Sequence, residues 1–157
     1  MKLKPDQEQL AFQLMKGLPI FSGVPEEALR EMVSQVDARE IVAGKVVLMD
    51  QEIGRTLYVI ATGRVGVWKG VGAHRRKLAV LKAPDFCGER SMFEESPASA
   101  LVKTEEDSLI YSIDRNAFLP ISVKYPAMMD PIKRNMEVIR AQRMGPSQAP
   151  ASGDALV

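Results

Sequence analysis

Short runs of β-forming residues, separated by glycine, proline or charged residues, fill the middle of this sequence from residue 36 to residue 113. Within these runs apolar and polar side chains alternate, which is the period of a strand with one buried face. The runs cover residues 40–42, 46–49, 57–60, 65–68, 78–81, 100–102 and 108–113. Seven short strands at this spacing predict a mainly β fold, a sandwich or jelly roll.

Three polar or glycine-containing segments connect these runs. Segments 43–45 and 61–64 each place a glycine between alternating runs, so we predict a hairpin at both. Segment 70–77 holds the single histidine, His74, and is typical of a hairpin tip. Metal centres and acid–base relays need clusters of His, Cys and carboxylates, so a metal-dependent jelly-roll enzyme is excluded. We therefore expect that the protein is not an enzyme, binds no metal and has no catalytic residue.

Helical periodicity precedes the β region. Residues 6–16 predict a short amphipathic helix that ends at Gly17, with Asp6 as its N-cap behind Pro5. A second helix is expected to begin at Pro25, where acidic residues suit a helix N-terminus. The apolar positions of the two helices are Leu10, Leu14 and Met15, then Leu29, Met32 and Val33.

Helical periodicity returns after the β region. Asp114 is expected to cap one helix, and Asp130 followed by Pro131 marks the start of another. That last helix carries an apolar stripe of Met129, Ile132, Met136 and Ile139 and a polar side of Lys133, Arg134, Glu137 and Arg140. The stripe either packs on the chain's own β domain or forms a homodimer seam, for which it is too short by itself.

Charge and cysteine content limit the possible partners and location. The 21 Lys and Arg residues nearly balance 20 Asp and Glu, so no global field attracts nucleic acid or an anionic membrane. Cys87 is the single cysteine, which together with the lack of a secretory leader favours the cytoplasm, and no apolar run could span a bilayer. Residues 144–157 predict a disordered tail that cannot form a DNA-binding helix-turn-helix, so we expect no DNA partner.

One segment, residues 85–103, interrupts the β pattern with a helical turn. Gly88 permits a close approach of backbone to a ligand, and a helix that starts there offers unpaired N–H groups to an anion. Glu89 adds an acceptor for sugar hydroxyls. Taken alone, a glycine before a helical turn is also compatible with a plain bend.

Three motifs in order give this segment a context. They are residues 18–29, beginning Leu-Pro-Ile-Phe; residues 54–65, beginning Gly-Arg-Thr-Leu-Tyr; and Gly88-Glu89 with Pro97. With these motifs the sequence resembles the cyclic-nucleotide-binding domain family. The resemblance implies an N-terminal helix (1–17) and a domain (18–143) that contains an eight-stranded jelly-roll barrel and a C-terminal lid or dimer helix. It also implies a helical phosphate-binding segment at residues 88–94, which we call the cassette.

The resemblance also implies a ligand site. In the family the residue at Glu89 binds the ribose 2′-hydroxyl, and backbone amides that include Gly88 meet the sugar-phosphate. The family's phosphate-binding arginine falls on Ala98, a loss of about 2–5 kcal/mol of binding free energy. Arg90 on the cassette is a candidate replacement. The expected ligand-binding residues are Phe86, Cys87, Gly88, Glu89, Arg90, Ser91, Ala98, Ser99 and Ala100.

Two functions follow from this pattern. The first is a regulatory sensor that binds cAMP or cGMP as its ligand, without a cofactor, and signals through its C-terminal helix to a protein partner or second subunit. The second is an interaction or scaffold domain that kept the fold and lost the ligand, which the absent arginine would allow. Titration with cyclic nucleotides discriminates between them.

Overall fold

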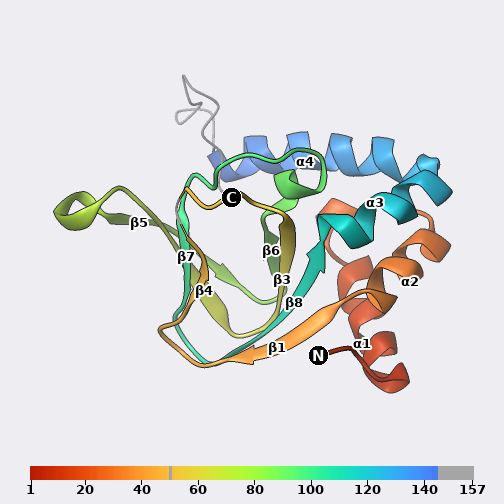
Figure 1. Ribbon diagram of the computed structural model, residues 1–157, viewed down its shortest axis with the longest axis horizontal. Coiled ribbons are helices and arrows are strands. Elements are labelled where there is room, and N and C mark those ends of the chain that lie inside the picture. The colour runs from red at the N-terminus through yellow and green to blue at the C-terminus, as the bar shows by residue number, and fades with distance from the viewer. Residues whose placement is uncertain (50, 145–157) are drawn as a thin grey trace.

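Eight strands form two four-stranded antiparallel sheets in the computed structural model, which describes residues 1–49 and 51–144 (Figure 1). The strand order is β1-β8-β3-β6 in one sheet and β2-β7-β4-β5 in the other. The strands are β1 (Asp37–Ile41), β2 (Val46–Leu48), β3 (Thr56–Thr62), β4 (Arg64–Lys69), β5 (Arg76–Lys82), β6 (Asp85–Cys87), β7 (Leu101–Thr104) and β8 (Ser108–Asp114). The predicted eight-stranded jelly-roll fold is confirmed, as two facing sheets.

Each predicted run of β-forming residues lies in or overlaps a strand. The alternation pattern missed β6, which is three residues long and therefore too short to show a period. It pairs with β3 in the register Tyr58↔Cys87, Val59↔Phe86 and Ile60↔Asp85. This pairing places the residues that precede Gly88 at the edge of the first sheet, beside β3.

Two of the predicted hairpins are wrong. β1 pairs with β8 and β2 with β7, so residues 43–45 carry the chain from one sheet to the other. β3 and β4 likewise lie in different sheets, and residues 61–64 form a corner. Gly44 and Gly63 have φ of 85° and 88°, a conformation that both hairpins and corners use, so the local sequence does not distinguish them. The third hairpin, β4–β5, is confirmed.

The helices lie before the first strand, at the tip of the β4–β5 hairpin, in the cassette and after the last strand. They are α1 (Pro5–Lys16), η1 (Pro19–Phe21), α2 (Glu26–Ser34), η2 (Gly72–His74), η3 (Glu89–Met92), α3 (Arg115–Lys124), η4 (Pro126–Met128) and α4 (Met129–Met144). The predicted cap of α3 is confirmed, because the Asp114 carboxylate accepts a hydrogen bond from the Asn116 N–H at 3.0 Å.

The prediction for α1 needs two corrections. Its N-cap is Lys4 rather than Asp6, because Pro5 occupies the first helical position, where its missing N–H is not needed. Leu10 is 71% exposed, and the buried face consists of Ala11, Phe12 and Met15. The stripe of α2 is confirmed, since Leu29, Met32 and Val33 are buried.

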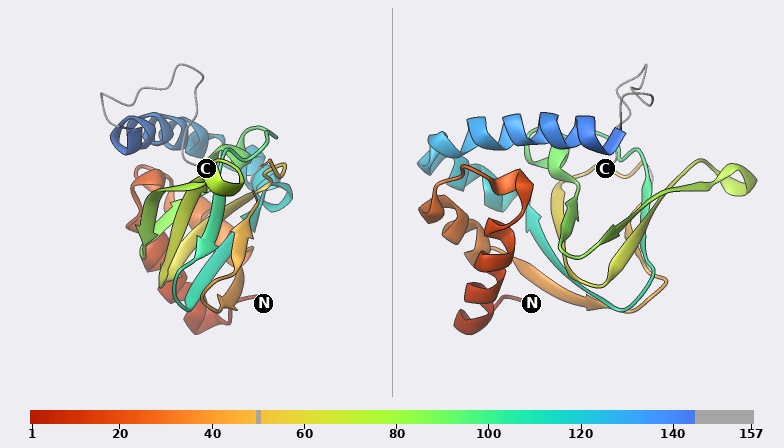
Figure 2. Two further views of the ribbon diagram at one scale, coloured as in Figure 1. Left: turned by 90° about the vertical axis from the view of Figure 1, so that its left-hand side faces the viewer. Right: turned by 180° about the vertical axis from the view of Figure 1, so that it is seen from behind.

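Alternating residues of the first sheet supply two separate cores. Leu57 and Val59 of β3 belong to a core shared with α1, α2, α3 and α4, whereas Ile60 belongs to a core between the two sheets. The helices therefore cover the outer face of the β1-β8-β3-β6 sheet (Figures 1 and 2). This is the β alternation expected from the sequence, with both faces of the first sheet buried.

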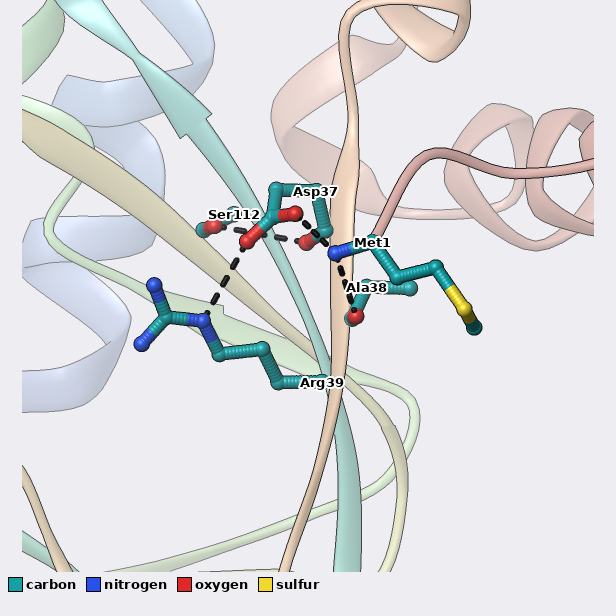
Figure 3. Close-up of polar contacts among 5 residues, drawn as sticks. All are labelled: Met1, Asp37, Ala38, Arg39 and Ser112. Carbon is teal, nitrogen blue, oxygen red and sulfur yellow. Dashed lines mark hydrogen bonds and ion pairs between the residues drawn. The ribbon is translucent and has the colours of Figure 1, made fainter.

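The start of the chain lies along β1. The Met1 amino group donates hydrogen bonds to the Asp37 carboxylate and to the Ala38 carbonyl oxygen (Figure 3). Arg39 Nε donates to the same carboxylate at 3.2 Å, and Ser112 Oγ donates to the Asp37 carbonyl oxygen at 3.3 Å. The Met1 hydrogen bond is the largest effect that holds the pKa of Asp37 below its ordinary value.

The apolar stripe of α4 packs on its own chain. Ile132 and Ile139 are buried in the helix-side core, and Met129 and Met136 pack against it. Asn135 Nδ2 donates to the carbonyl oxygens of Ile20 and Ser22 at 3.0 and 2.8 Å. The polar side is exposed as predicted, at Lys133, Arg134, Glu137 and Arg140. Of the predicted tail, residues 144–157, Met144 is the last residue of α4, and residues 145–157 lie outside the described residues.

Candidate functional site: the cassette cleft

The cassette, predicted at residues 88–94, begins at Gly88, which follows β6 in the left-handed conformation with φ of 80°. A Cβ atom at this position would lie 2.5 Å from the Thr56 carbonyl oxygen, so both backbone conformation and space require glycine. The 3-10 helix η3 follows, and the Ser91 N–H donates to the Gly88 carbonyl oxygen at 3.0 Å. The predicted helical turn is confirmed but ends at Met92.

A cleft opens between η3 and the segment that precedes β7. Its empty volume is about 310 Å³, including the part open to solvent. The lining residues are Leu48, Gly54, Gly88, Arg90, Ser91, Ser96, Pro97, Ala98 and Ser99. A Cβ atom at Gly54 would lie 2.5 Å from Ser91 Oγ, so glycine allows the backbone at residue 54 to lie close to η3.

Backbone hydrogen bonds hold the second wall in place. The Gly54 N–H donates to the Ser96 carbonyl oxygen at 3.1 Å, and the Ala98 N–H donates to the Glu52 carbonyl oxygen at 2.7 Å. Ala98 is 8% exposed and belongs to the core between the sheets. The Ala98 methyl group therefore gives the cleft an apolar lining at the position where the family resemblance implies an arginine.

Arg90 provides a cation in this cleft. Its side chain is 32% exposed, and its Nε lies 3.7 Å from a Glu94 carboxylate oxygen. Such a partly exposed pair on one helical turn contributes little stability. Breaking the Arg90–Glu94 pair so that the guanidinium binds another anion therefore costs little free energy.

Glu89 lies outside the lining of the cleft and faces α4. The residue is 8% exposed, and its Oε1 lies 3.8 Å from an Arg143 guanidinium nitrogen. Burial raises the pKa of Glu89 to about 7, and the positive charge of Arg143 opposes part of this shift. Glu89 Oε2 is buried without a hydrogen-bond partner among the described residues.

Arg143 ties the last turn of α4 to the cassette. Its guanidinium donates to the Asp85 carboxylate at 2.8 Å and to the Phe86 carbonyl oxygen at 2.9 Å. The same group stands 4.6 Å from the centroid of the Phe86 ring. The side chain is only 14% exposed. The last turn of α4, the first two residues of β6 and Glu89 thus form one electrostatic cluster.

The structure brings together five of the predicted site residues in the cleft: Gly88, Arg90, Ser91, Ala98 and Ser99. Phe86 lies in the helix-side core, and Cys87 and Ala100 lie in the core between the sheets. Burial raises the pKa of the Cys87 thiol to about 12, so this thiol stays protonated and acts as a small apolar side chain.

Five residues were missed as site residues: Leu48, Gly54, Ser96, Pro97 and Arg143. Gly54 had a sequence signal, because it begins one of the three motifs. Arg143 had none, since it lies 58 positions from its partner Asp85 and only the fold brings them together.

The fold and the cleft together define a jelly-roll domain with a cleft at its cassette. The sequence pattern of the cyclic nucleotide-binding domain matches residues 38–125, and the chain belongs to this family. The resemblance inferred from the motifs is confirmed.

Known proteins share sequence similarity or the fold with this chain. The cyclic AMP receptor protein of Thermus thermophilus is 28% identical over 131 residues, covering 83% of this chain and 59% of that protein. The regulatory domain of Toxoplasma gondii PKA with cAMP has a TM-score of 0.74 at 16% identity, covering 89% and 51%. The regulatory subunit of a cAMP-independent protein kinase A from Trypanosoma brucei has a TM-score of 0.68 at 18% identity, covering 87% and 52%.

The chain spans about half the length of the curated relatives it matches. Within residues 1–49 and 51–144 no helix is long and apolar enough to cross a membrane. The same residues contain no group of three or more His, Cys, Asp or Glu side chains that could hold a metal ion.

Proposed function

We propose that this chain is a regulatory, non-catalytic domain that binds cAMP or cGMP in the cassette cleft and uses Arg90 in place of the family's arginine. The main observation in support of this proposal is that Arg90 lines the same cleft as Gly88, Ala98 and Ser99. The cleft therefore keeps a cation, although it comes from the opposite wall.

The energetic balance supports this exchange. A phosphate that loses a bidentate arginine loses about 2–5 kcal/mol of binding free energy. A charge-assisted hydrogen bond from Arg90 restores roughly 1.5–3 kcal/mol, at the expense of a weak pair with Glu94. We expect binding that is weaker than in a site with both walls charged, and a strong dependence on Arg90.

The ribose side of the site leads to α4. The buried Oε2 of Glu89 has no hydrogen-bond partner among the described residues, and in this proposal it accepts from a ribose hydroxyl that reaches past Gly88, beyond the present lining of the cleft. Oε1 of the same carboxylate faces Arg143. A ligand that stabilises the charged form of Glu89 also strengthens its attraction to Arg143. We propose that nucleotide binding tightens the last turn of α4 and that this helix transmits the signal to a protein partner or second subunit.

A second candidate function is an interaction domain without a nucleotide ligand. Ala98 favours it, because the lost arginine is the main phosphate contact implied by the family resemblance. The structural neighbour from Trypanosoma brucei, whose name calls its kinase cAMP-independent, shares the fold.

Calorimetric titration of the nucleotide-stripped protein with cAMP, cGMP and cyclic dinucleotides separates the two functions. Under the sensor function at least one cyclic mononucleotide binds, and Arg90→Ala weakens it at least about tenfold. Arg134→Ala, an exposed arginine on the polar side of α4, is the matched control and leaves the affinity unchanged. Absence of binding by every nucleotide refutes the sensor function.

The coupling to α4 has its own measurement. With saturating nucleotide, hydrogen exchange in the last turn of α4 should slow in the wild type and stay unchanged in Arg143→Met. Nucleotide binding with equal exchange in both proteins would refute transmission through Arg143.

A further inference from the structure

The hairpin formed by β4, η2 and β5 projects from the body of the protein (Figures 1 and 2). We call residues 64–82 the β4–β5 arm. The arm contains six Lys and Arg residues and no Asp or Glu, in a chain whose net charge is only +1. Positive charge is therefore concentrated on one projecting element. The basic residues are Arg64, Lys69, Arg75, Arg76, Lys77 and Lys82.

Acidic residues next to the arm compensate part of this charge. Lys77 pairs with Glu105, and Arg64 lies 3.4 Å from Glu105 and 3.8 Å from Glu106. Arg76 and Lys82, by contrast, are exposed on β5, and neither has an ion pair within the described part of the chain. The two ends of β5 thus carry uncompensated positive charge.

β5 is also an edge strand. It pairs with β4, and no strand among the described residues pairs with its other side. Leu78 and Val80 are 42% and 39% exposed between the charged ends. An edge with open backbone groups and apolar side chains is a template for an added strand.

Charge decides which strand can be added. Two copies of β5 placed edge to edge would bring like charges together, which disfavours self-association. The same lysine and arginine side chains attract a strand with carboxylates at matching positions. The edge is therefore selective for an acidic partner.

We propose that β5 is a docking edge for an extended acidic segment of a partner protein, which adds a fifth strand to the β2-β7-β4-β5 sheet. Backbone hydrogen bonds supply the pairing, Leu78 and Val80 supply apolar contact, and Arg76 and Lys82 select acidic side chains. A segment of about five to seven residues, or roughly 17–23 Å, matches the length of β5. The proposal is independent of nucleotide binding.

A labelled heptapeptide that alternates Glu with Val tests this proposal by fluorescence anisotropy, with the Gln-for-Glu peptide as the neutral control. We expect the acidic peptide to bind with Kd below about 1 mM at low salt and the neutral one to bind at least about tenfold more weakly. Trp68, the only tryptophan, lies on β4 with its ring 5.2 Å from Lys77 Nζ, so its emission reports directly on the arm.

Charge reversal gives the matched comparison. Arg76→Glu with Lys82→Glu should weaken the acidic peptide at least about tenfold, whereas Lys2→Glu with Arg134→Glu, two exposed cations outside the arm, should not. Bound peptide should slow hydrogen exchange of the β5 amides. The proposal is overturned by no binding at about 1 mM, by equal binding of the neutral peptide, by equal loss in both double variants, or by binding of duplex DNA or anionic vesicles in place of the peptide.

Discussion

Replacing Arg143 by methionine should destabilise the protein in a pH-dependent way. Methionine keeps an unbranched apolar stem over Phe86 but removes the hydrogen bonds to Asp85 and to the Phe86 carbonyl oxygen. It also leaves the buried Glu89 without its positive neighbour. The substitution thus isolates the charge of the guanidinium from its packing.

The magnitude follows from these contacts. Charged hydrogen bonds contribute roughly 1.5–3 kcal/mol each, but Asp85 is 31% exposed and water replaces part of its loss. Removing one partner of a buried ion pair costs about 3–5 kcal/mol when the other stays charged. We expect a loss of about 3 kcal/mol in the free energy of unfolding at pH 8, and about 1–2 kcal/mol at pH 5.

The pH dependence has a definite sign. The pKa of Glu89 in the folded state, about 7, is above its ordinary value, so the folded protein binds this proton more tightly than the unfolded chain. The contribution of Glu89 is therefore greatest at low pH and declines as the pH rises from about 4.5 through 7. Arg143 lowers the pKa of Glu89 in the folded state. Without Arg143, the stabilising contribution of Glu89 therefore continues to decline to a higher pH, and the difference in the free energy of unfolding from wild type increases.

Urea unfolding, followed by far-UV circular dichroism at pH 5 and pH 8, measures this difference. The control is the same substitution in the Glu89→Gln background, which lacks the group that titrates: adding Arg143→Met to Glu89→Gln should cause a similar loss at both pH values, relative to the Glu89→Gln variant. A loss for Arg143→Met that is equal at pH 5 and pH 8 would refute the coupling of Arg143 to Glu89.

Three further substitutions test the structure. Gly88→Ala should lower the free energy of unfolding by about 2–3 kcal/mol in urea titrations, because alanine is strained at positive φ and its Cβ meets the Thr56 carbonyl oxygen; no loss would contradict this turn. Asn135→Ala should cost about 1–2 kcal/mol and raise the hydrogen-exchange rate of α4, because two carbonyl oxygens of the η1 region lose their donor. Asp114→Ala should cost about 1 kcal/mol through the lost cap of α3, and Asp114→Asn should restore most of it.

The sequence by itself determined the local features of this protein. Alternating side chains predicted the strand segments because burial of one face follows a period of two, and the Asp114 cap follows from a bond two residues away. Gly88 was identified before a helical turn because glycine is suited to positive φ. The three motifs gave the family because they keep their order and spacing along the chain.

Tertiary structure decided the features that join distant residues. Segments 43–45 and 61–64 became corners between sheets, since a positive-φ glycine turn is the same in a hairpin and a corner and only strand pairing distinguishes them. Arg90 reached the cleft, and Arg143 reached Glu89, through packing that no local pattern encodes. The apolar stripe of α4 was compatible with a dimer or with the chain's own core, and the contact with that core was decided by the fold.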